Sequence, residues 1–156
     1  MTEGLHYTAC GLDYVYLQNG YQIRDTKHGK ATAIRDAQGL HDAIARAIIS
    51  SPHRLRGQEV RFLRAQLKLS QEGLARVLRQ RRGSVARWEA APAKDIPGPA
   101  DAALRMFYAL KADQHAVAER LVDLLTEIDE LEHKLSIREA AFRDTDDGWR
   151  PLPHAA

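Results

Sequence analysis

The first 35 residues contain short apolar runs separated by turn-forming pairs. Tyr14–Leu17 and Tyr21–Ile23 flank Asn19-Gly20, a pair that tolerates the positive φ of a tight hairpin turn. A second turn at His28-Gly29 leads into Ala31–Ile34. The pattern therefore predicts a small three-stranded antiparallel meander at the start of the chain.

The apolar positions change to helical spacing after these strands. Asp36 is suited to cap a helix there, and Ser50-Ser51-Pro52 is suited to end it. The apolar face of this helix consists of Leu40, Ile44, Ala47 and Ile48. The strands thus gain a helix to pack against.

The middle of the chain has a wholly helical pattern. We expect three short helices, the second capped by Ser70, and a fourth with Pro99 in its first turn. Their apolar positions are Val60, Leu63 and Leu67 in the first, Leu74, Ala75, Val77 and Leu78 in the second, Val85 and Trp88 in the third, and Ala103, Leu104, Phe107, Tyr108 and Leu110 in the fourth. The fourth helix is expected to close a bundle.

The last part of the chain combines an amphipathic stretch with an acidic tail. Between residues 114 and 135, apolar residues recur at alternating steps of three and four, which is the spacing of a helix-pairing face. These dimerisation candidates are Leu121, Leu124, Ile128, Leu131 and Leu135. Two such repeats do not establish a coiled coil. The turn-forming stretch Asp144–Gly148 either frays or forms a small hairpin.

Charge is segregated along the chain. Residues 54–87 hold ten Lys and Arg residues against two acidic residues, a net charge of +8. Residues 113–147 hold eleven acidic residues against four basic ones, a net charge of −7. The first segment suits a polyanion as a partner, whereas the second would be repelled by one.

Other residue patterns argue against several classes of protein. Cys10 is the single cysteine, and His6, Cys10, His28 and His41 match no short zinc motif, so we expect no disulfide and no metal. The chain has no glycine-rich phosphate-binding loop and no serine nucleophile elbow, so we expect that the protein is not an enzyme and binds no cofactor. An apolar run of about 18 residues and a signal peptide are also lacking, which favours a cytoplasmic protein without membrane contact.

Residues 69–89 carry a recurring DNA-binding pattern. Ser70-Gln71, Leu74-Ala75, Leu78, Val85 and Arg87-Trp88-Glu89 stand at the spacing of the helix-turn-helix of the Cro and XRE repressor family, which this segment resembles. The resemblance implies a transcription regulator whose motif has a core of Leu74, Ala75, Leu78, Val85 and Trp88. Arg79 replaces the usual turn Gly and Arg81 replaces the usual capping Ser, so we expect a longer or strained turn.

The second helix of this pair is expected to enter the major groove, which accepts one helix. An arginine bonds guanine N7 and O6 together, and the base-reading candidates on this helix are Arg81, Arg82, Ser84 and Arg87. The phosphate-binding candidates are Gln71, Arg54, Arg56 and Arg79. The alternative for each basic residue is a solvated surface charge. Glu89 is expected to bond within the protein, because a carboxylate facing phosphate weakens binding.

The layout of Tyr7 to Lys111 also resembles antitoxin regulators of the MqsA kind, in which a small β-rich N-terminal lobe precedes a helical DNA-binding half. In that family paired cysteines hold zinc in the N-terminal lobe, whereas Cys10 here stands alone. Because the paired cysteines are missing here, we expect an N-terminal lobe of this kind without metal. The resemblance leaves open an alternative function: an antitoxin that binds a toxin protein through the N-terminal lobe and autoregulates its operon.

The sequence therefore predicts an α+β protein that is mainly α. Residues 1–50 are expected to form the N-terminal lobe, a β-meander plus a helix. Residues 51–112 are expected to form a five-helix Cro-like helix-turn-helix domain, and residues 113–156 an acidic C-terminal helix and tail. The expected function is a repressor or autorepressor that binds double-stranded DNA.

We predict that the protein is a homodimer that places two helices in successive major grooves of a palindrome, with half-sites roughly 34 Å apart. Sedimentation velocity is expected to give twice the chain mass of 17.5 kDa. A monomer both with and without the operator would remove this prediction.

Overall fold

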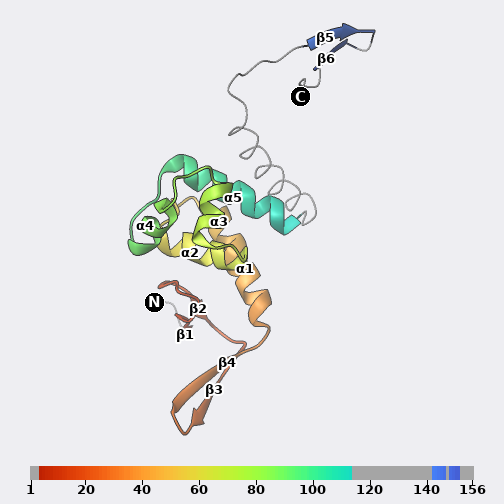
Figure 1. The fold of residues 1–156 in the computed structure, drawn as a ribbon. Coiled ribbons are helices and arrows are strands. Elements are labelled where there is room, and N and C mark those ends of the chain that lie inside the picture. Colours follow the sequence, from red (N-terminus) through yellow and green to blue (C-terminus); the bar gives the residue numbers. More distant parts are fainter. Residues whose placement is uncertain (1–3, 114–141, 147, 152–156) are drawn as a thin grey trace. The chain divides into compact units, whose positions relative to one another are not determined.

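The computed structural model describes residues 4–113, 142–146 and 148–151 (Figure 1). The chain divides into two compact units, residues 1–120 and residues 121–156. In the described ranges, five helices and three two-stranded antiparallel sheets occur, so the fold is mainly helical with some sheet. No described helix is long and apolar enough to cross a bilayer. The dimerisation candidates Leu121 to Leu135 lie outside the described residues.

The N-terminal strands form two separate hairpin-like pairs. β1 (Leu5–His6) pairs with β2 (Tyr16–Leu17), and β3 (Tyr21–Thr26) pairs with β4 (Gly29–Ile34). The predicted three-stranded meander is therefore wrong, although the turn before β4 was placed correctly. Leu17 is 8% exposed, whereas β3 is almost wholly exposed, so the chain around Gly20 leaves the interior and does not fold back to pair β2 with β3.

Helix α1 (Ala37–Ser50) has the ends that the sequence predicted. The Asp36 carboxylate accepts a hydrogen bond of 3.1 Å from the Gly39 N–H, and the helix ends at Ser50. Ile44 and Ile48 are buried, whereas Ala47 is exposed. Ala45 is completely buried, so the buried face of α1 includes Ala45 and not the predicted Ala47.

Four helices follow α1: α2 (Gly57–Gln66), α3 (Gln71–Val77), α4 (Ser84–Ala90) and α5 (Gly98–Asp113). The sequence predicted five helices between residues 51 and 112. The structure has four there, and the fifth described helix, α1, lies before this range. The largest fully buried side chains of the four are Val60, Leu63, Leu74, Val85 and Leu104, and Leu55 and Ile96 from the segments before α2 and α5 are buried with them. Burial of this apolar surface is the main source of stability for helices as short as α3 and α4.

The segment between β1 and β2 contacts the helical part of the chain directly. The Asp13 N–H donates to Gln58 Oε1 at 3.2 Å, and the Tyr7 hydroxyl lies 3.0 Å from Nε2 of His41. Tyr14 lies beneath the guanidinium of Arg56, the N-cap residue of α2. The described residues up to 113 fall within one compact unit.

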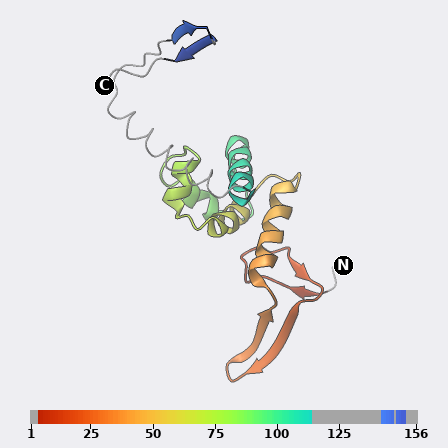
Figure 2. The same ribbon diagram turned by 90° about the vertical axis from the view of Figure 1, so that its right-hand side faces the viewer.

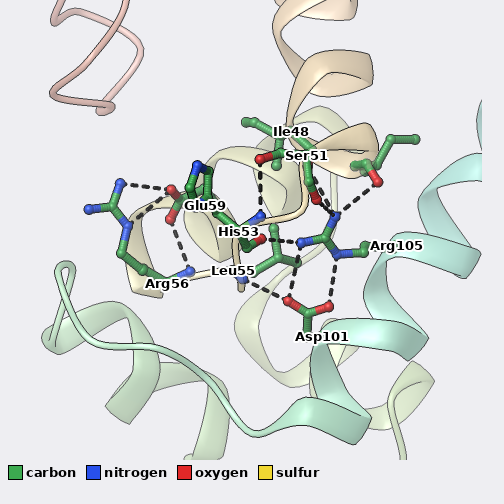
Figure 3. A network of polar contacts seen from close by, with 9 residues as sticks. Ile48, Ser51, His53, Leu55, Arg56, Glu59, Asp101 and Arg105 are labelled. Atoms are coloured by element: carbon green, nitrogen blue, oxygen red, sulfur yellow. Dashed lines mark hydrogen bonds and ion pairs between the residues drawn. The ribbon is translucent and has the colours of Figure 1, made fainter.

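Arg105 of α5 joins α5 to the end of α1 (Figure 3). Its Nε donates to Asp101 Oδ1 at 2.8 Å, and its Nη1 donates to the carbonyls of Ile49 and Ser51 at 3.0 and 2.6 Å. Asp101 also accepts a 2.6 Å hydrogen bond from the Leu55 N–H. The last carbonyls of a helix have no partner within it, so this one side chain satisfies several of them.

The described part of the second unit is a hairpin of β5 (Phe142–Thr145) and β6 (Gly148–Pro151). The Thr145 hydroxyl donates to the Gly148 carbonyl at 2.6 Å across the turn. Of the two alternatives for the tail, the structure has the hairpin.

We predict that Arg105→Ala lowers the free energy of unfolding by about 3 kcal/mol, because Asp101, at 14% side-chain exposure, loses its ion pair and keeps only the hydrogen bond from the Leu55 N–H. Urea denaturation measures the change. Arg46→Ala on the exposed side of α1 is the control and should change stability by less than about 0.5 kcal/mol. Equal losses in the two variants would contradict the role of the network.

Candidate nucleic-acid interface

Helix α3 is held in place by a cap at its start and an apolar inner face. The Ser70 hydroxyl accepts a 2.9 Å hydrogen bond from the Gly73 N–H, as the sequence predicted. Leu74, Ala75 and Leu78 are buried, with exposures of 0%, 3% and 7%. The opposite face of α3 is therefore available to solvent.

The chain leaves α3 through a strained residue. Arg79 has φ 55°, in the left-handed region that the sequence analysis expected to be disfavoured at this position. The Gln80 N–H donates to the Ala75 carbonyl at 2.8 Å and the Arg79 N–H to the Arg76 carbonyl at 3.2 Å. These two bonds form a helix end that usually contains Gly. An L-residue in this conformation is destabilised by about 1–2 kcal/mol.

Glycines are important at both ends of helix α4: Gly83 is its N-cap, and Gly57 of α2 lies against its C-terminal part. Gly83 has φ 91° at the N-cap, and Val85 directly after it is 1% exposed. Near the other end, a Cβ atom on Gly57 of α2 would clash with the carbonyl oxygen of Trp88. Because Gly57 has no side chain, the backbones of α2 and α4 approach closely. This contact fixes the direction of α4.

The carboxylate of Glu89 joins α2, α3 and α4. It accepts two hydrogen bonds from Arg64, at 2.5 and 3.0 Å, and one from Nε2 of Gln71 at 2.8 Å. The Glu89 side chain is only 7% exposed. Glu89 thus bonds within the protein, as the sequence predicted, and its charge is neutralised there.

Glu59 is neutralised in the same way. Its carboxylate accepts hydrogen bonds from the backbone N–H and the guanidinium of Arg56, at 3.0 and 2.9 Å. The hydrogen bond to Glu59 raises the pKa of Arg56. Burial, with the Glu59 carboxylate as a second cause, raises the pKa of the Tyr14 hydroxyl well above its usual value.

The remaining charge on residues 54–89 is exposed and almost entirely positive. Glu72 is the one exposed acidic residue of this range, and its distance to Arg76 is 3.8 Å. The exposed basic residues are Arg54, Arg61, Lys68, Arg76, Arg79, Arg81, Arg82 and Arg87. We call these eight side chains the basic surface. The two basic residues that are only half-exposed, Arg56 and Arg64, are those paired with buried carboxylates.

The base-reading candidates are placed unequally. Arg81, Arg82 and Arg87 are exposed. Arg87 lies on α4, whereas Arg81 and Arg82 precede its N-cap Gly83, so their expected placement on this helix is wrong. Ser84 is only 5% exposed, so its assignment to the exposed face is wrong. Ser84 is the first residue of α4, and like its neighbour Val85 it is buried. Its hydroxyl instead accepts a 3.3 Å hydrogen bond from Nη2 of Arg87.

The phosphate-binding candidates also differ in their exposure and contacts. Arg54 and Arg79 are exposed members of the basic surface, and Gln71 is exposed with its amide on Glu89. Arg56 is corrected: its guanidinium is paired with Glu59 and lies 5.5 Å from the centre of the Tyr14 ring. A cation held in this way is less suited to bind a phosphate.

The predicted core positions Leu74, Ala75, Leu78 and Val85 are all buried, whereas Trp88 is half-buried. Sequence reasoning missed Arg64 as the partner of Glu89. The two residues are 25 positions apart, and a single sequence has no signal that pairs them.

The histidines considered for a metal site have other contacts. His6 stacks on Tyr16 with ring centroids 4.6 Å apart, and His41 lies between Tyr7 and Gln66. In the ranges 4–113, 142–146 and 148–151, no three His, Cys, Asp or Glu side chains gather as metal ligands.

Comparisons with known proteins add no family to this description. No model of a protein family, no curated protein and no solved structure matches the chain.

We predict that Glu89→Gln lowers the free energy of unfolding by about 2 kcal/mol or more, because Arg64 loses the charge of its buried partner. Glu72→Gln is the matched control on α3, since its carboxylate is 59% exposed and its pair with Arg76 is long. The control should change stability by less than about 0.5 kcal/mol. Chemical denaturation distinguishes the two, and a small change for Glu89→Gln would disprove its structural role.

Proposed function

We propose that this protein is a sequence-specific DNA-binding transcription regulator in which α3 and α4 act as a helix-turn-helix. The observation that supports the proposal is the charge of residues 54–89, where eight cations and one carboxylate are exposed. A surface of this kind attracts the phosphate backbone and releases its counterions. The apolar faces of α3 and α4 are buried, so their outer faces remain for contact with DNA.

In this proposal α4 enters the major groove, which has the width of one helix. Arg82 and Arg87 read bases, because each guanidinium has the planar fork that fits the two acceptors of guanine. Ser84 contacts Arg87 and not a base, so its role is to orient that guanidinium. Arg54, Arg79 and Arg81 are assigned to phosphates, which position the helix without selecting sequence.

The regulator proposed here binds a palindrome as a homodimer and represses transcription by occupying its operator. Two helices in successive major grooves require a two-fold arrangement of the protein that matches the symmetry of the DNA. Repression needs no cofactor, because occupancy of a promoter by itself blocks access.

We predict that Arg87→Ala loses roughly 1–3 kcal/mol of discrimination at one base pair, because one bidentate contact is removed. The operator is first obtained by selection from random duplexes with the full chain. Fluorescence anisotropy then compares that duplex with single-base-pair variants.

Arg46→Ala is the control, since Arg46 is an exposed cation of α1 outside the basic surface. It should retain the preference of the wild-type protein at every base pair. Equal affinity of the wild-type protein for the selected duplex and for a random duplex at moderate salt would contradict the proposed function.

A further inference from the structure

The β3–β4 hairpin is a ribbon that lies outside the packed part of the molecule. Of its twelve strand residues, ten are exposed, and only Tyr21 and Ile34 at the base are half-buried. Figure 2 shows the two strands extending from the start of α1. An isolated two-stranded hairpin gains little stability in water. The packing of the core therefore does not explain why this segment is present.

The two faces of the ribbon differ in chemistry. Side chains alternate between faces along a strand, so Gln22, Arg24 and Thr26 of β3 share one face. The register places three small residues of β4 opposite them, namely Ala33, Ala31 and Gly29. We call this the smooth face. The 3.1 Å hydrogen bond from Nη2 of Arg24 to Oε1 of Gln22 agrees with their common orientation.

The smooth face has the shape and chemistry of a surface that approaches another molecule closely. Its β4 half has nothing larger than a methyl group, so the backbone there is open to contact. Its β3 half carries an amide and a guanidinium, spaced two residues apart. These are the side chains that pair with adenine and guanine edges, respectively.

The charge of the ribbon is also positive. Arg24, Lys27, Lys30 and Arg35 are exposed, and Asp25 is the one acidic residue between positions 21 and 35. Asp25 faces Lys30 across the ribbon, which offsets its charge. Lys27 lies in the two-residue connection at the tip. The end of the ribbon therefore suits a polyanion better than it suits an ordinary protein surface.

We propose that the β3–β4 ribbon is a second DNA-reading element, which inserts its smooth face into the major groove while Lys27 at its tip contacts a phosphate. The major groove admits a two-stranded ribbon as well as a helix, so the dimensions agree. Arg24 and Gln22 read bases. This inference rests on the proposed function in one respect, that the partner of the chain is DNA.

The test uses the full chain and the duplex selected with it. Affinities for the selected duplex and for each single-base-pair variant are measured for the wild-type protein, Arg24→Ala, Gln22→Ala and Arg87→Ala. Thr32→Ala is the matched control, because Thr32 lies on the other face of the same ribbon, opposite Ile23. The substituted side chains of the ribbon are exposed, and circular dichroism checks that the helices are retained.

Arg24→Ala is expected to lose roughly 5- to 150-fold discrimination at base pairs that Arg87→Ala leaves unchanged. Thr32→Ala should behave as the wild-type protein. Lys27→Gln should weaken binding to all duplexes and reduce the slope of log affinity against log salt by about one.

The outcomes separate this inference from the proposed function. If only Arg87→Ala loses discrimination, the ribbon does not read DNA and this inference is overturned, while the proposed function stands. If only Arg24→Ala and Gln22→Ala lose discrimination, the ribbon reads DNA and the role of α4 is overturned. If selection gives no preferred duplex, both proposals fail.

Discussion

The pairing of two buried carboxylates with arginines is the interaction on which the rest of the structure depends. Glu89 receives Arg64 of α2 and Gln71 of α3, so one side chain of α4 holds three helices together. A buried carboxylate without such a partner is strongly unfavourable. Glu59 and Arg56 form a second pair at the start of α2. The charge of each carboxylate is thereby compensated within the protein and contributes little to the electrostatic potential at the surface.

The same pairing determines the character of the surface. Each pair withdraws one carboxylate and one guanidinium together, so the net charge of residues 54–89 stays the same and the pairing decides only which charges are exposed. Because the charges of Glu59 and Glu89 are compensated internally, the basic surface is opposed by Glu72 alone among the exposed residues of this range. The folding of the helices and the choice of which charges are exposed therefore have a common cause.

The features that sequence analysis predicted well are those decided by near neighbours. Asp36 and Ser70 cap α1 and α3 because a side-chain oxygen reaches a backbone N–H three residues later. The positive φ of Arg79 was expected from its position in the turn. Periodicity also identified Leu74 and Val85 as interior positions, since a helix has a fixed repeat.

The features that were missed depend on residues distant in the chain. Asn19-Gly20 has suitable turn chemistry, but β2 pairs with β1, which no local signal indicates. Ser84 was assigned to the outer face of α4, although the direction of its helix relative to α2 buries it. Arg105 bonds carbonyls more than 50 positions away, and no pattern in α5 distinguishes it from a surface arginine.

Arg79 shows that two requirements on this molecule oppose one another. Its left-handed backbone is a position where Gly would relieve strain, yet Gly would also remove a member of the basic surface. Selection for thermal stability alone would therefore favour Gly at this position and lower the positive potential at the turn. Engineering of the protein for heat tolerance would meet a trade-off here between a relaxed backbone and affinity for polyanions.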